Sequence, residues 1–153
     1  MEELQDGVVL RLSSIKHDFP PDSPTLQLWH FELSENDKAH AARTGQPPRL
    51  SVFDAERTTP GQAQTIWGVE KESAAFGLRV REIQAVHVAG LAPLRVVRDP
   101  LAPPLGDLPG ADGHCGIAGL ARRPGEPKAF YRELRVRLAD LSFRLDGGVL
   151  HPY

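Results

Sequence analysis

The sequence predicts an α+β protein that folds as a single compact domain over residues 1–153. We expect a mostly antiparallel sheet of five to seven short strands, two short helices and one long amphipathic C-terminal helix. Short segments that alternate apolar and polar residues predict the strands, and apolar residues at helical spacing near the C-terminus predict the long helix. The length of 153 residues suits one hydrophobic core.

The first predicted elements are two strands and a surface helix. Alternation over 7–13 predicts a strand, and the same pattern returns over 25–33 after a turn-rich loop. Ser34 can cap a helix whose acidic first turn suits the positive end of the helix dipole. This helix should run to about Arg43, because Gly45 follows.

A second short helix is predicted in the middle of the chain. Thr59 can cap it, Pro60 suits its first position and Gly68 ends it. Short apolar or alternating runs predict further strands at residues 50–53, 75–80, 83–88 and 94–97.

The strongest loop signal is the segment 99–113, which contains four prolines and three glycines. Its leucines should pin it across the body of the domain. Because long ordered loops often line binding sites, the segment is a candidate lid for a small-molecule site.

The long helix is predicted from about Pro127 to about Ser142. Its core-facing stripe comprises Phe130, Tyr131, Leu134, Leu138, Leu141 and Leu145. Phe143 lies outside this stripe, so either the helix ends before it and the chain turns inward, or it marks a second contact surface. The tail 149–153 either adds an edge strand or stays loose.

Basic residues gather near the C-terminus. Residues 1–112 hold 11 basic and 16 acidic side chains, whereas 113–153 hold 7 basic and 4 acidic ones. Lys128, Arg132 and Arg135 lie opposite the apolar stripe of the long helix. With Phe143 they form a candidate binding surface for another protein, and an acidic partner fits its charge. The small excess of positive charge argues against nucleic acid as the partner.

Cys115 and His114 are the only candidates for nucleophilic catalysis that the sequence suggests, and both are weak. A thiol enzyme needs a thiolate, which a nearby imidazole can stabilise. In a strand, however, neighbouring side chains point to opposite faces, so Cys115 would be buried while His114 points away. Either Cys115 is a buried structural residue, or it acts with His114 or a distant histidine.

Several functional classes are not expected. The histidines form no metal-ligand motif, so neither a metal nor another cofactor is predicted. The single cysteine excludes an internal disulfide. No apolar run approaches the roughly 20 residues of a membrane span. The N-terminus lacks a signal-peptide pattern. We therefore expect a soluble cytoplasmic protein. The abundance of Arg, Ala, Gly and Pro is typical of a GC-rich bacterial genome.

The functional hypothesis favoured by the sequence is a small bacterial protein-binding module without enzymatic activity, of adaptor, accessory or immunity type. The first alternative is a thiol-dependent enzyme that uses Cys115 with a histidine. The second is a small-molecule sensor with the 99–113 loop as its lid. The sequence leaves the process and the oligomeric state open.

Overall fold

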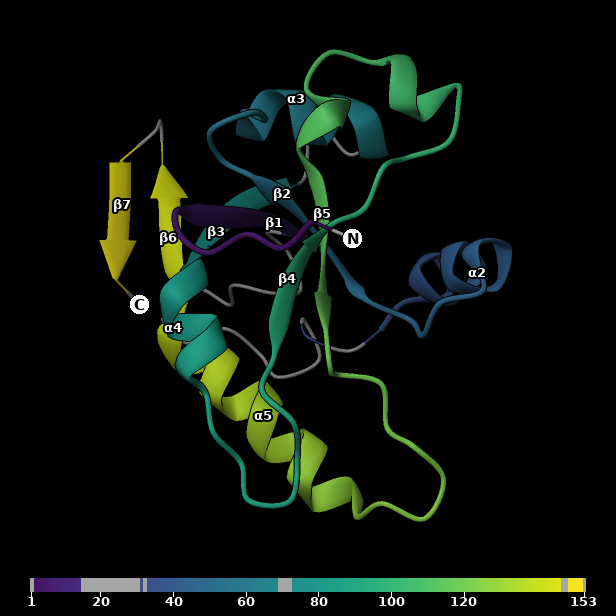
Figure 1. Cartoon of the computed structure of the whole chain (residues 1–153). Helices are drawn as coiled ribbons and strands as arrows, with labels where there is room; N and C mark the ends of the chain where they lie inside the picture. Colours follow the sequence, from purple (N-terminus) through teal and green to yellow (C-terminus); the bar gives the residue numbers. More distant parts are fainter. Residues whose placement is uncertain (1, 15–30, 32, 69–72, 147–148, 153) are drawn as a thin grey trace.

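The computed structural model describes residues 2–14, 31, 33–68, 73–146 and 149–152 (Figure 1). Seven antiparallel strands form one sheet in the order β4-β5-β2-β1-β3-β6-β7. The strands are β1 (Val8–Ser14), β2 (Leu50–Asp54), β3 (Ser73–Arg79), β4 (Arg95–Arg98), β5 (His114–Ala118), β6 (Phe143–Asp146) and β7 (Val149–Pro152). The α-helices are α2 (Glu35–Thr44), α3 (Pro60–Trp67), α4 (Val80–Ala85) and α5 (Lys128–Leu141). The predicted α+β class is confirmed, and the described residues form a single domain.

The helices α2 and α3 begin and end at the residues that the sequence predicts. Ser34 caps α2 through a reciprocal bond pair with Asp37, and Thr59 caps α3 in the same way with Gln62. Both helices end at a glycine in the left-handed conformation. Gly45 after α2 has φ 70°, and Gly68 after α3 has φ 69°. These boundaries are set by local chemistry, which explains why they could be predicted.

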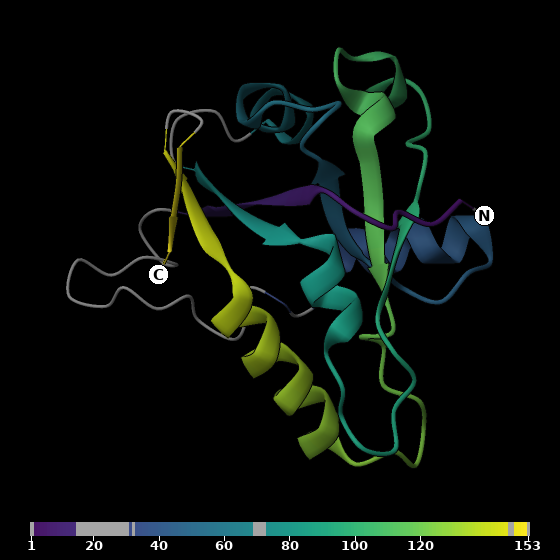
Figure 2. The ribbon, with the colours of Figure 1, turned by 60° about the vertical axis from the view of Figure 1, so that its left-hand side comes forward.

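The sheet carries a separate apolar core on each face. The larger core holds alternate strand residues such as Val52 and Ile117 together with Leu138 of α5. The smaller core holds Phe53 together with residues of α3 and of the 99–113 loop. Both views show α4 and α5 side by side, with α3 and the loop at another end of the sheet (Figures 1 and 2). Neighbouring residues of β2, such as Val52 and Phe53, therefore enter different cores.

The prediction of a strand over 83–88 is wrong. Residues 83–85 form the end of the short helix α4, because Val80 and Ile83 are one helical turn apart and both are buried, and 86–88 form neither helix nor strand. A short apolar run is compatible with either structure, and packing against the sheet decides between them. The strand expected over 25–33 lies largely outside the described residues, although Phe31 is buried in the larger core.

The loop 99–113 is ordered by two 3-10 turns, η2 (Leu105–Asp107) and η3 (Ala111–Gly113). Leu101 and Leu108 pack against the smaller core. The hydroxyl of Thr58 donates a hydrogen bond to the Gly110 carbonyl over 2.5 Å. These contacts hold the loop across one face of the sheet.

The C-terminal helix buries the middle of the predicted stripe, and then the chain turns inward. Phe130 and Leu141 are half-buried, and Leu145 lies beyond the helix in β6. Tyr131, Leu134 and Leu138 are buried, and α5 ends before Phe143, which is 7% exposed in β6. The guanidinium of Arg79 stacks over the Phe143 ring at 3.9 Å. The tail then adds β7 as the edge strand. In the described part of the chain, no helix has the length and apolar character needed to cross a membrane.

Candidate functional site

Cys115 and His114 lie on opposite faces of β5. Val52 pairs with Cys115 and Phe53 pairs with His114, so the thiol enters the larger core while the imidazole lies on the other face beside the Phe53 ring. Both are buried, Cys115 with 0% and His114 with 3% exposure. The alternation expected for a strand therefore separates the thiol from the neighbouring imidazole.

The thiol of Cys115 is protonated at neutral pH. Burial raises the pKa of Cys115 to about 11, although the nearby Arg98 guanidinium opposes this shift. The thiol donates a weak hydrogen bond to the Gly113 carbonyl over 3.4 Å. A thiolate is the reactive form of cysteine, so the position of Cys115 favours the structural interpretation.

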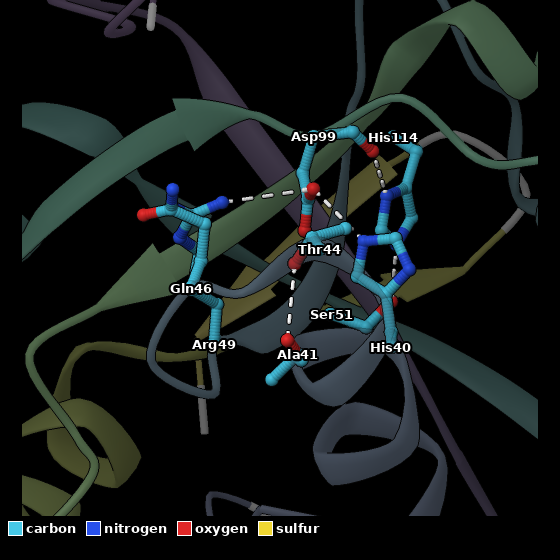
Figure 3. Close-up of polar contacts among 8 residues, drawn as sticks. All are labelled: His40, Ala41, Thr44, Gln46, Arg49, Ser51, Asp99 and His114. Carbon is cyan, nitrogen blue, oxygen red and sulfur yellow. Dashed lines mark hydrogen bonds and ion pairs between the residues drawn. The ribbon is translucent and has the colours of Figure 1, made fainter.

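His114 instead meets a serine from the neighbouring strand. The Nε2 atom of His114 lies 2.7 Å from the Oγ of Ser51 in β2, and Nδ1 lies 2.5 Å from the main-chain oxygen of Asp99 (Figure 3). A carbonyl can only accept a hydrogen bond, so Nδ1 carries the proton. Nε2 must then accept, and the Ser51 hydroxyl donates to it.

The imidazole of His114 is held in its neutral form. Burial lowers the pKa of His114, and the nearby His40 acts in the same direction. The main-chain oxygen and the carboxylate of Asp99 oppose the shift without reversing it. At neutral pH the Nε2 lone pair is therefore available to the serine proton.

The Asp99 carboxylate links this pair to α2. His40 Nε2 lies 2.9 Å from Asp99 Oδ1, and Arg49 Nη1 lies 3.6 Å from the same oxygen. The side chains of His40 and Arg49 are 19% and 11% exposed, while Asp99 is buried. Figure 3 shows the three side chains converging beside His114. The cluster thus combines one carboxylate, one guanidinium, two imidazoles and one hydroxyl.

Aromatic rings form the other walls around His114. The Phe53 and Trp67 rings stand edge-on to the imidazole, with centroids 5.3 Å and 5.9 Å away. The His40 ring centroid lies 6.2 Å away. These rings exclude water from the imidazole, which is the physical origin of its lowered pKa.

Gly116 makes room for the stem of Arg49. A Cβ atom at Gly116 would lie 2.7 Å from Arg49 Cβ, which is too close for any other residue without movement. Gly116 pairs with Ser51 in the sheet register, so Arg49 and Ser51 share the face that carries His114. The guanidinium therefore belongs to the same site as the serine hydroxyl.

The residues predicted to bind a protein partner lie elsewhere. Lys128 and Arg132 are exposed on α5, and Arg135 is half-buried. Phe143 is buried beneath Arg79 and is therefore removed from the exposed candidate surface, because the chain turns inward after α5.

The sequence does not single out Ser51, Asp99, His40 or Arg49. Ser51 lies in β2, Asp99 at the end of β4, His40 in α2 and Arg49 in the segment before β2. Only the strand register brings them to His114. Among the described residues, no group of three or more His, Cys, Asp or Glu side chains is placed to hold a metal ion. Comparison with known proteins gives no significant match to a family model, a curated protein or a solved structure.

Proposed function

We propose that this protein is an enzyme of the hydrolase class that cleaves a carboxylic ester with Ser51 as nucleophile and His114 as base. The proposal depends on one observation, the 2.7 Å hydrogen bond from the Ser51 hydroxyl to Nε2 of a neutral, buried imidazole. A nucleophile, a base in hydrogen-bond reach and a third group that orients the base make up the arrangement that activates serine. Here the main-chain oxygen of Asp99 is the orienting group.

The site supports acyl transfer in two steps. In the first, Ser51 Oγ attacks the ester carbonyl while its proton passes to His114 Nε2, and that proton then goes to the departing alcohol. The product is an ester of Ser51. In the second step, His114 takes a proton from water, the hydroxide attacks the acyl carbon, and Ser51 leaves with the proton from His114. The acid is released and the starting state is restored.

Arg49 supplies positive charge for the oxyanion that forms in each step. Its guanidinium has five N–H donors, and its contacts with Asp99 and Gln46 are long, at 3.6 Å and 3.4 Å. Such donors stabilise an oxyanion most where water is largely excluded, and the Arg49 side chain is only 11% exposed. Ser51 is half-buried.

A fluorophosphonate probe tests the proposal directly, because it phosphonylates activated serines. We expect labelling of the native protein at Ser51, mapped by peptide mass spectrometry, and none in Ser51→Ala. A general base contributes roughly 10²- to 10⁴-fold, so His114→Gln should slow labelling at least about 100-fold.

Thr44→Ala is the matched control for this experiment. Thr44 lies on α2 near the cluster, and its hydroxyl donates to the Ala41 carbonyl over 3.3 Å. This variant should be labelled at the wild-type rate. A native protein whose Ser51 resists the probe at neutral pH would contradict the proposal.

A second candidate function is the binding of an acidic protein by the exposed side of α5, in a bacterial cytoplasmic adaptor, accessory or immunity-like protein. Support comes from Lys128 and Arg132, which are both exposed on α5. A tagged protein should then capture a stoichiometric partner from native lysate. The pair Lys128→Glu and Arg132→Glu should lose it. Arg137→Glu, on another side of the same helix, should retain it.

A further inference from the structure

Asp99 connects α2 to the imidazole through two different groups. Its carboxylate accepts from His40 over 2.9 Å, and its main-chain oxygen accepts from His114 Nδ1 over 2.5 Å. Its own N–H donates to the main-chain oxygen of His114 over 3.1 Å. One residue at the end of β4 therefore contacts both histidines of the cluster.

The peptide group that follows Asp99 lacks one of the two hydrogen-bonding groups of an ordinary peptide. The next residue is Pro100, which has no N–H, so this peptide group carries only the carbonyl as a hydrogen-bonding group. In most peptide groups an N–H on the opposite side helps to fix the direction of the carbonyl. The proline ring restricts the Asp99 backbone. The direction of the carbonyl is fixed further by the bond from the Asp99 N–H to His114 and by the buried carboxylate, which His40 and Arg49 hold.

We infer that Asp99 is a positioning residue, whose carboxylate is held by His40 of α2 and by Arg49 so that its main-chain carbonyl keeps His114 in the Nδ1-protonated tautomer. The inference concerns the same site as the proposed hydrolase function, and its consequence for catalysis rests on that proposal. Only this tautomer leaves Nε2 free to accept the Ser51 proton. Through the contact between His40 and Asp99, the tautomer of His114 therefore depends on how α2 packs.

Nitrogen NMR of the histidine rings measures the tautomer without any substrate. In the wild type at neutral pH, His114 should show protonated Nδ1 and unprotonated Nε2, with slow exchange of the Nδ1 proton. Asp99→Ala and His40→Ala should both shift His114 to a mixture of tautomers and speed this exchange. Because His40 is a partly exposed helical position, His40→Ala should fold even if Asp99→Ala does not.

The matched control is again Thr44→Ala on α2, which should leave the His114 resonances unchanged. In His40→Ala, the rate of Ser51 labelling should fall in proportion to the population of the Nδ1-protonated tautomer. A folded His40→Ala protein whose His114 tautomer and proton exchange equal those of the wild type would overturn the inference.

The two proposals fail in different ways. If His114 responds to His40→Ala while wild-type Ser51 resists the probe, the positioning role stands and the hydrolase function is refuted. If wild-type Ser51 is labelled but the His114 tautomer and proton exchange do not change in His40→Ala, the hydrolase function stands and the positioning role is refuted.

Discussion

Acid should destabilise this protein through His114. Burial lowers the pKa of His114 below the ordinary value of 6.5, so the folded protein resists protonation where the unfolded chain accepts it. As pH falls through 6.5, the unfolded state therefore binds more protons than the folded state. The stabilisation is complete above 6.5 and is lost as pH falls toward the folded pKa.

The size of the effect follows from one proton. Between 6.5 and the lowered folded pKa, the free energy of unfolding should fall by about 1.4 kcal/mol for each pH unit. His114 is 3% exposed, so solvent screening does little to narrow the pH window over which this slope applies. Below the folded pKa both states are protonated, and this group contributes no further slope.

Urea unfolding at about pH 7.5, 6.5 and 5.5 measures this slope, provided that the m-value stays constant. His114→Gln should be less stable than the wild type at the highest pH and should lose this part of the acid dependence. His87→Gln is the matched control, because His87 is exposed, and it should keep the wild-type slope. The part of the acid dependence that comes from carboxylates should be the same in all three proteins. Equal acid slopes in His114→Gln and the wild type would refute the reasoning.

Three further outcomes are expected from the packing. Gly113→Ala should lower the free energy of unfolding, measured in urea, by about 1–3 kcal/mol, because the added Cβ would overlap the Thr58 hydroxyl. Gly61→Ala is the control: its Cβ would lie 4.0 Å from the nearest atom, so it should be neutral or stabilising in the same measurement. Iodoacetamide should modify Cys115 only after denaturation, and rapid modification of the native protein in a mass-spectrometric time course would contradict its buried, protonated state. Leu138→Ala should cost about 2–5 kcal/mol by calorimetry or urea unfolding, and a loss below about 1 kcal/mol would show that α5 is not anchored through this side chain.

The elements that the sequence predicts well are those determined by neighbours along the chain. Ser34 and Thr59 cap their helices through residues three positions ahead, and the α5 stripe follows from helical spacing. The segment 83–88 was mispredicted because its few apolar residues fit a strand and a helix equally well. There the choice is made by the surface of the sheet against which Ile83 packs.

The candidate site could not be predicted because none of its contacts is local. Ser51 and His114 are 63 positions apart, and His40 and Asp99 are 59 apart. A shift of one residue between β2 and β5 would turn Ser51 away from His114, since side chains alternate along a strand. The sequence predicts a strand at 50–53, but for the run around His114 it only allows one, and it specifies neither the partners nor the register of the two strands.

His114 and Cys115 show how one physical cause can have opposite chemical consequences. Burial disfavours the charged form of both side chains, raising the pKa of the thiol and lowering the pKa of the imidazole. The neutral thiol is the unreactive form of cysteine, whereas the neutral imidazole is the form that accepts a proton. The same β5 strand therefore leaves the thiol unsuited to nucleophilic attack and prepares its neighbour to act as a base. The reaction that we propose therefore takes place on the Ser51 face of the sheet and not at Cys115.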